Sequence, residues 1–511
     1  MKRPFCNGDE PKSGCARDLG GRLQSRNAPL GTSGDSDIER LYENMKKDTI
    51  AAISTGMTNS GIGIVRISGS EALETADRVY KGKIRISEAP SHTIHYGHVM
   101  DGAEMIDEVL VTVMRAPRTF TGEDTVEINC HGGTFVVRRV LETVLKNGAR
   151  PAEPGEFTKR AFLNGKMDLS QSEAVMDLIS SQNEYALQSS VNQLKGSLKN
   201  KITDIRNRII YHTAYIESAL DDPEHISLEG YGDTLREEAE AMTGEVEKLI
   251  RSADTGRIMK EGIQTVIVGK PNAGKSSLLN VLTGYDRAIV TDIEGTTRDV
   301  LEEEIRLKGL LLNVVDTAGI RSTEDVIEKM GVDRAKEYAR NADLVIYVVD
   351  SSRELDENDE KIMEMICDKK AVILLNKSDL DTVVTEEMVM EKMRKVAEKC
   401  EKTFSDIPMI IISARDESGI EEFEETVEKM FLRGDVSFND EIYITNARQK
   451  KDLQDAAESL KKVIESIDAG MPEDFYSIDL MDAYEALGNI TGESMGEDLI
   501  NEIFSKFCMG K

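Results

Sequence analysis

Several residue types are scarce in this chain of 511 residues: it has no tryptophan, 5% aromatic residues and six cysteines. The cysteines are scattered without paired spacing, which favours reduced thiols over a disulfide framework or a zinc site. No run approaches the roughly 20 apolar residues that a membrane-spanning helix requires. The N-terminus also lacks a secretory pattern. These absences favour a cytoplasmic protein that does not enter a membrane.

Basic residues are also few relative to acidic ones: the chain has 64 Lys and Arg and 94 Asp and Glu, which gives a net charge of −30. A chain this acidic has no general attraction for nucleic acid. If it acts on RNA, it must use a local basic patch or a basic partner. The simplest interpretation of the acidity is a soluble surface. The 40% hydrophobic content allows ordinary cores, and this length accommodates two to four domains.

Residues 269–276, Gly-Lys-Pro-Asn-Ala-Gly-Lys-Ser, have the spacing of a P-loop. A β-branched, apolar run at 264–268 precedes them, and a helix-like run at 277–282 follows. This strand–loop–helix context predicts a phosphate site, since glycines let backbone N–H groups face an anion. We expect Lys275 to reach the β- and γ-phosphates and the Ser276 hydroxyl to bind Mg²⁺.

Three later segments specify the base, and each follows a strand-like run: Asp316-Thr317-Ala318-Gly319, Asn376-Lys377-Ser378-Asp379 and Ser413-Ala414-Arg415. The carboxylate of the second segment can accept hydrogen bonds from N1–H and the exocyclic amine of guanine. Adenine has no such pair of donors, so a site built this way rejects it. The third segment can close over the base through backbone groups. Four motifs in this order predict GTP binding.

One expected group is absent, because Ile320 stands where many small GTPases have the glutamine that orients water. Either hydrolysis is poor or water is oriented in another way. The side chain of Asn272 could ligate a monovalent cation beside the phosphates and so stabilise charge. A loop-capping asparagine explains Asn272 equally well. Residues 291–299 are expected to form the first switch, with Thr297 on Mg²⁺ and backbone carbonyls available to the cation.

The order of patterns predicts an α/β plus all-α protein. Residues 1–45 are an expected disordered extension, a mis-assigned start (Met45 being the candidate initiator) or, less favoured, a targeting peptide. Residues 46–164 mix short strands, such as 62–67 and 108–114, with helices such as 134–147. Helical patterns fill 165–259 and 434–511, and the doubly wound nucleotide domain spans 260–433. A domain inserted between two helical stretches suggests that the stretches pack together as one discontinuous domain.

The nucleotide motifs, together with flanking segments, resemble the MnmE (TrmE) family of tRNA modification GTPases. The flanking segments are 64–69 (Ile-Val-Arg-Ile-Ser-Gly), 120–124, 131–133, 154–166 and the tail 507–511 (Phe-Cys-Met-Gly-Lys). The resemblance covers residues 47–511. Related ribosome-assembly GTPases share the nucleotide motifs but not these flanks or this tail.

The resemblance implies a fold: an N-terminal folate-binding and dimerisation domain, a split helical domain and an inserted Ras-like P-loop GTPase domain. It implies a homodimer that works with the flavoprotein MnmG as a heterotetramer. The implied reaction installs an aminomethyl-type (carboxymethylaminomethyl) group on the wobble uridine of certain tRNAs. The implied one-carbon source is a reduced folate, 5-formyltetrahydrofolate, and the implied ions are K⁺ and Mg²⁺.

The resemblance also implies roles for individual residues. Folate contacts fall on Arg66, Glu108, Lys166 and Lys511, which the residues alone would class as surface charges. Potassium ligands fall on Asn272, Thr291, Ile293 and Thr296. Glu328 matches the glutamate that positions water through a second water, and Arg321 is a weaker candidate near it. GTP contacts are expected from Asn272, Ala273, Gly274, Lys275, Ser276, Ser277, Thr291, Asp292, Ile293, Glu294, Gly295, Thr296, Thr297, Asp316, Thr317, Ala318, Gly319, Asn376, Lys377, Ser378, Asp379, Ser413, Ala414 and Arg415.

Three features stay open. Cys508 could be a nucleophile toward uridine, but no general base is identifiable near it, which favours a packing role for the tail. His92, His95 and His98 are spaced by three, and a strand-and-turn surface is favoured over a metal site. Residues 56–60 replace the Pro-Gly-rich turn usual in the family, and we expect the turn to form with Gly61 and Gly63 retained.

Two other functions compete with tRNA modification. A ribosome-assembly GTPase that binds ribosomal RNA is disfavoured by the acidic charge and the lack of a recognisable RNA module. A folate-dependent transferase with a vestigial GTPase domain is disfavoured because every phosphate-contacting residue is intact.

Overall fold

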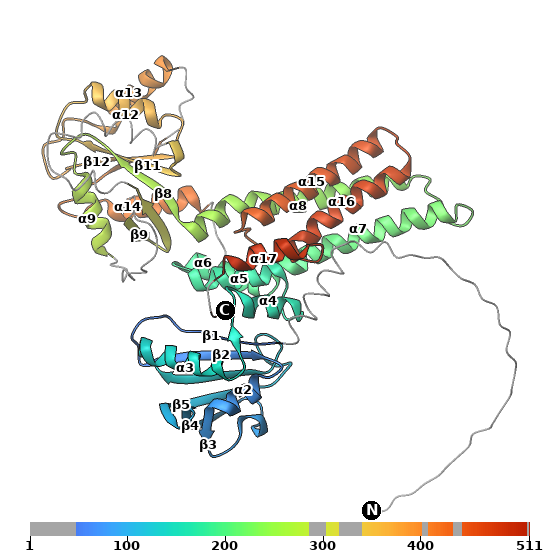
Figure 1. Ribbon diagram of the computed structural model, residues 1–511. Helices are drawn as coiled ribbons and strands as arrows, with labels where there is room; N and C mark the ends of the chain where they lie inside the picture. Colours follow the sequence, from blue (N-terminus) through green and yellow to red (C-terminus); the bar gives the residue numbers. More distant parts are fainter. Residues whose placement is uncertain are drawn as a thin grey trace, which may run out of the picture.

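The computed structural model describes residues 48–285, 303–315, 340–400, 407–432, 442–507 and 510. Figure 1 shows an α/β unit, a long helical unit and a second α/β unit that follows helix α8. Within the described ranges, no helix is long and apolar enough to cross a membrane. The expected extension at 1–45 lies outside the described residues.

The N-terminal unit is built on a seven-stranded sheet with the order β3-β4-β5-β6-β2-β1-β7. Side chains alternate between its faces, so Val65 and Ile67 enter the core beneath the helices. The strands expected at 62–67 and 108–114 and the helix expected at 134–147 are confirmed by β2, β5 and α3. The elements are β1 (Thr49–Ile53), β2 (Ile62–Gly69), α2 (Ala72–Val79), β3 (Tyr80–Gly82), β4 (Thr93–Asp101), β5 (Glu104–Met114), β6 (Thr125–His131), α3 (Thr134–Lys146), β7 (Arg150–Pro151) and α4 (Glu156–Leu163).

Helices from both sides of the nucleotide domain share one core, as the sequence predicts. Helices α7, α8, α15 and α16 bury a common set of aliphatic residues that includes Ile205, Val246, Leu453 and Leu480. Helix α15 packs on α8 and α16, and α16 packs on α7. The elements are α5 (Leu169–Ser180), α6 (Glu184–Leu194), α7 (Ser197–Asp221), α8 (Tyr231–Glu261), α15 (Ala447–Asp468), α16 (Glu473–Thr491) and α17 (Glu497–Ser505).

The nucleotide domain has a six-stranded sheet with the order β13-β12-β11-β8-β10-β9, in which only β9 among the described strands is antiparallel to its neighbour. Helices cover both faces, so the central strand β11 is buried along its whole length. The elements are β8 (Ile263–Val268), α9 (Lys275–Tyr285), β9 (Glu303–Leu307), β10 (Leu310–Val314), β11 (Leu344–Asp350), α12 (Glu357–Ile366), β12 (Ala371–Asn376), α13 (Glu386–Lys399), β13 (Met409–Ile411) and α14 (Ile420–Phe431).

The end of the chain returns to the N-terminal unit. Gly155 precedes α4 with φ +67, and a Cβ there would lie 2.6 Å from the Phe504 carbonyl and from Cβ of Phe507. Further along, Ser54 Oγ donates to the carbonyl of Gly510 at 3.1 Å. A glycine at 155 therefore allows the tail to lie against the start of α4 and the end of β1.

A buried ion cluster joins β1, the loop before β6 and α4. The Arg160 guanidinium is fully buried and binds carboxylates of Asp48 at 2.6 Å, Glu156 at 3.0 Å and Glu123 at 3.1 Å. Arg150 adds a second cation on Glu156 at 2.5 Å. Burial raises the pKa of Glu123 despite the nearby cation. The cluster is therefore stable only while its cations are present.

We predict that Arg160→Met destabilises the N-terminal unit by about 3–5 kcal/mol, because Glu123 and Glu156 lose a buried counter-charge. Urea unfolding of the full chain, followed by hydrogen exchange of β1 and β6, measures the loss. Arg85→Met is the control, since Arg85 is 70% exposed beside Asp77 and its loss is expected to change little. Equal stability of Arg160→Met and wild type would show that the cluster does not hold these elements together.

Candidate functional site

The P-loop connects β8 to α9, and its backbone geometry requires glycine at two positions. Gly269 has φ +154, and a Cβ there would lie 2.4 Å from the Val348 carbonyl. Gly274 has φ +101, and a Cβ there would lie 2.0 Å from Nδ2 of Asn376. The loop therefore packs tightly against the ends of β11 and β12 and turns directly into α9, whose first backbone N–H groups suit an anion.

Asn376 brings the phosphate and base segments together. Its Nδ2 donates to the carbonyl of Ala273 in the P-loop at 2.8 Å, and its Oδ1 accepts from the amide of Ala414 at 3.0 Å. The Ser413 hydroxyl donates to Asp379 Oδ1 at 3.0 Å. Three motifs far apart in the sequence thus form one continuous site along the carboxyl ends of β8, β12 and β13.

Lys275 lies within the P-loop. Its ammonium donates to the carbonyls of Gly269 at 2.7 Å and Lys270 at 2.8 Å, and burial lowers the pKa of this lysine. The cationic group therefore sits in the concave side of the loop, where phosphate oxygens can replace the carbonyls as acceptors.

A second lysine ties the start of the P-loop to α12. Lys270 lies 2.7 Å from the buried carboxylate of Asp359, which also accepts from the Tyr347 hydroxyl at 2.7 Å. Burial alone would lower the pKa of Lys270, but its bonds to Asp359 and Asp356 raise it. This support was not predicted from sequence, because the four residues share no motif spacing.

An ion pair also supports the loop that is expected to bind the guanine base. Lys377, which has φ +70, donates to Asp350 at 2.6 Å. Burial alone would raise the pKa of Asp350, but the hydrogen bonds from Lys377 and Ser352 lower it. The pair fixes the loop that carries Asp379.

Asn272 is exposed and has φ +61. Within the described part of the chain, its side chain makes no hydrogen bond, while its left-handed φ is one that asparagine adopts more readily than most residues, so both interpretations of Asn272 stand. The remaining predicted contacts of the switches, Thr291, Asp292, Ile293, Glu294, Gly295, Thr296, Thr297, Asp316, Thr317, Ala318, Gly319, Arg321 and Glu328, lie outside the described residues.

In the N-terminal unit, Arg66 on β2 pairs with Glu127 on β6 at 2.8 Å and lies near the rings of Phe120 and Phe157, at 5.9 and 5.6 Å. The structure does not bring Glu108 to this group. Glu108 is exposed on β5, opposite His98 of β4, and β6 separates β5 from β2. Glu127 was missed, because its place opposite Arg66 depends on the pairing of β2 with β6, which are not consecutive strands.

The structure describes one of the two remaining expected folate contacts, Lys166. Lys166 is exposed, and its ammonium donates to the carbonyl of Pro117 at 3.0 Å. Gly510 lies beside Ser54, just past the end of β1, and Ala52 of β1 lies opposite Arg66 in register. Lys511 and Cys508 lie outside the described residues.

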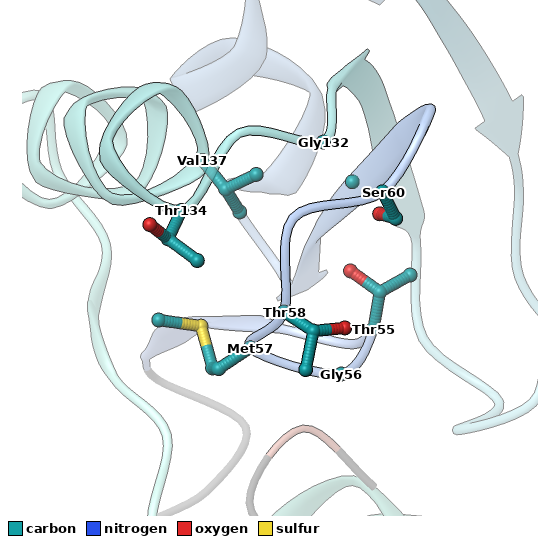
Figure 2. A pocket seen from close by; sticks show the side chains of 9 residues that line it. Thr55, Gly56, Met57, Thr58, Ser60, Gly132, Thr134 and Val137 are labelled. Carbon is teal, nitrogen blue, oxygen red and sulfur yellow. The ribbon is translucent and has the colours of Figure 1, made fainter.

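The turn expected at residues 56–60 forms without proline. Figure 2 shows it facing the start of α3, with Met57, Thr58 and Thr134 among the residues that line the pocket between them. The amide of Ser60 donates to the Gly132 carbonyl at 3.1 Å. A Cβ on Gly63 would lie 2.3 Å from the side chain of Val137, so the retained glycine is needed for this contact.

The three expected surface histidines do not form a ligand set. His95 contacts the Thr93 hydroxyl at 2.7 Å, and His92 contacts the hydroxyl of Ser91 at 2.8 Å. Across the described ranges, no group of three histidine, cysteine or carboxylate side chains is placed to hold a metal ion.

Comparison with known proteins covers almost all of the chain. A family model of the MnmE helical domain matches residues 169–508, and one of the GTP-binding protein TrmE N-terminus matches residues 49–166. Three relatives carry the name tRNA modification GTPase MnmE. The protein of Lachnoclostridium phytofermentans is 56% identical over 91% of this chain and 100% of its own length. The proteins of Acetivibrio thermocellus and Geobacillus kaustophilus are 48% and 46% identical, each over 91% of this chain and 100% and 99% of their own lengths. The chain belongs to the MnmE family of tRNA modification GTPases.

Proposed function

We propose that this chain is a GTP hydrolase whose nucleotide cycle drives modification of the wobble uridine of certain tRNAs, in a complex with MnmG in the cytoplasm. GTP binding is supported by the two hydrogen bonds of the Asn376 side chain, which hold the phosphate-binding loop and the base-binding loop in one site. The tRNA part rests on family membership over 91% of the chain. Matches to the N-terminal and helical family models leave the ribosome-assembly alternative without support.

Each residue of the nucleotide site has a distinct task in this proposal. Backbone N–H groups of the P-loop and the Lys275 ammonium bind the phosphates, and Asp379 accepts from the guanine edge. The loop fits a phosphate chain, since Gly269 and Gly274 adopt positive φ and pack against Val348 and Asn376, which leaves backbone N–H groups of the loop available to an anion. Ser276 and Thr297 would hold Mg²⁺, which neutralises phosphate charge when bound. Glu328 would position the attacking water, and Arg321 is a weaker candidate beside it. Ile320 cannot take this role, because its side chain can neither accept a hydrogen bond from water nor stabilise charge.

The exposed oxygen donor of Asn272 suits a K⁺ ion beside the phosphates. Thr291, Ile293 and Thr296 would complete its ligand set. A hard cation favours such oxygen ligands, and its charge would take the place of an arginine finger in the transition state.

In the N-terminal unit, the pairing of Arg66 with Glu127 favours Glu127 over Glu108 as the carboxylate partner of a pterin ring. Phe120 and Phe157 supply an apolar wall beside the same pair. Lys166 and Lys511 would bind the glutamate tail of 5-formyltetrahydrofolate. The described neighbours of Cys508, Phe507 and Gly510, lie against Gly155 and Ser54, and we assign that cysteine a packing role in the tail and not a nucleophilic one.

Homodimer formation through the N-terminal unit is supported by the exposed apolar side chains of its open sheet face. Ile94, Tyr96 and Leu110 are 63%, 55% and 48% exposed on the neighbouring strands β4 and β5. An apolar patch of this kind is typical of a protein interface.

We predict that Asp379→Asn lowers GTP affinity by about 100-fold or more and raises affinity for xanthosine triphosphate, because the amide can donate to the oxygen that replaces the guanine amine. Isothermal titration calorimetry with GTP and with xanthosine triphosphate measures both affinities. Asp381→Asn, an exposed neighbour, is the matched control and should bind GTP normally. Unchanged GTP affinity in Asp379→Asn would exclude this carboxylate as the base contact.

We predict that GTP hydrolysis is faster in K⁺ than in Na⁺ by about tenfold or more, and that Asn272→Ala removes most of this difference. The reason is that Na⁺ is too small for the same set of oxygen ligands. Phosphate release at constant ionic strength measures both. Equal rates in the two salts, or an Asn272→Ala variant with the full potassium effect, would contradict the assignment.

A further inference from the structure

The hairpin β9–β10 links the two nucleotide-sensing segments of the chain. It spans Glu303–Val314, between the first switch expected at 291–299 and the Asp316-Thr317-Ala318-Gly319 motif. Its turn, Lys308-Gly309, has φ +42 and +85. The hairpin is therefore covalently continuous with the two segments whose positions are expected to depend on the γ-phosphate.

A tyrosine of the helical unit lies against the tip of this hairpin. Tyr185, near the start of α6, places its Cε2 atom 3.0 Å from the position that a Cβ on Gly309 would occupy. Its hydroxyl donates to Glu428 of α14 at 3.3 Å. The ring packs on the core that β9, β10 and α14 share, and burial together with Glu428 raises the pKa of its hydroxyl. Tyr185 therefore contacts two elements of the nucleotide domain at once.

Helix α6 is also bonded to both connections between the nucleotide domain and the helices. Asn183 caps α6 through the amide of Ala186 at 2.7 Å, and its Nδ2 donates to the carbonyl of Met259 at 2.9 Å, near the end of α8. At the other end of α6, Gln193 donates to the carbonyl of Tyr443 at 2.7 Å, where the chain leaves the nucleotide domain. Movement of α6 is thus mechanically tied to the incoming and the outgoing connection.

We propose that Tyr185 is a coupling residue, through which the position of the β9–β10 hairpin is transmitted to α6 and from there to the helical unit. This inference rests on the proposed GTP function. Glycine at 309 lets the ring pack directly on the backbone, so the hairpin cannot move toward α6 without displacing the ring. The contacts that carry the inference are those of Tyr185 with Gly309 and Glu428, which belong to the hairpin and to α14 and not to the nucleotide motifs.

The test is hydrogen–deuterium exchange of the full chain with GDP and with a non-hydrolysable GTP analogue. In the wild type, amide exchange in α6 is expected to differ about fivefold or more between the two nucleotides. In Tyr185→Ala, the difference in α6 is expected to fall below about twofold, while the difference in the P-loop stays. Tyr185→Phe, which keeps the ring on Gly309, is expected to retain the response.

Two variants keep the test decisive. Tyr211→Ala removes a 65% exposed tyrosine of α7 in the same helical unit and is expected to respond as the wild type does. If Tyr185→Ala fails to fold, Tyr185→Leu preserves apolar volume without the ring and takes its place. GTP hydrolysis by Tyr185→Ala is expected to stay within about twofold of the wild type, while tRNA modified per GTP hydrolysed falls about fivefold or more.

A full nucleotide response of α6 in Tyr185→Ala would overturn the inference, as would a wild type in which the P-loop responds and α6 does not. A wild type whose P-loop does not distinguish the nucleotides would overturn the proposed GTP function instead. The two failures are therefore distinguishable in one experiment.

Discussion

The nucleotide site depends on the two hydrogen bonds of the buried Asn376 side chain. One binds the P-loop at Ala273 and the other binds the base loop at Ala414. Without them, the loops that bind the two ends of a nucleotide would be joined only through the sheet below. Gly274 is required for the same contact, because any side chain there would occupy the position of the Asn376 amide. Lys270 and Lys377 extend the arrangement outward by fixing each loop to a buried carboxylate.

The remaining units are organised around the insertion of this domain. Helices on either side of it share one core. The two connections to the domain lie next to each other, since a Cβ on Gly256 of α8 would lie 2.2 Å from the carbonyl of Ile444, just before α15. The tail of the bundle in turn reaches β1 of the N-terminal unit, beside the strand that carries Arg66. The covalent chain thus provides a continuous physical route from the GTP site to the candidate folate site. Contacts such as that of Tyr185 at the hairpin determine whether movement follows this route.

Much of the fold could be predicted from sequence, because its main signals are local. The P-loop pattern, the strand-like run before each nucleotide motif and the helical periods on both sides all have short spacings, and the structure confirms the elements that they predict. The carboxylate beside Arg66 could not be placed this way, since the partner depends on strand order. Glu108 and Glu127 both lie on strands of the same sheet, and only the register across β2 and β6 selects Glu127. Lys270 with Asp359, and Tyr185 with Gly309, likewise depend on how distant elements pack.

The most direct test of the account measures modified nucleosides in total tRNA by mass spectrometry. The strains required lack this gene and carry either the wild type or Lys275→Ala. The account predicts that the aminomethyl-type wobble uridine disappears without the gene and returns only with the wild type. An unchanged nucleoside profile in the deletion strain would contradict the tRNA function, and full restoration by Lys275→Ala would contradict a role for the nucleotide site.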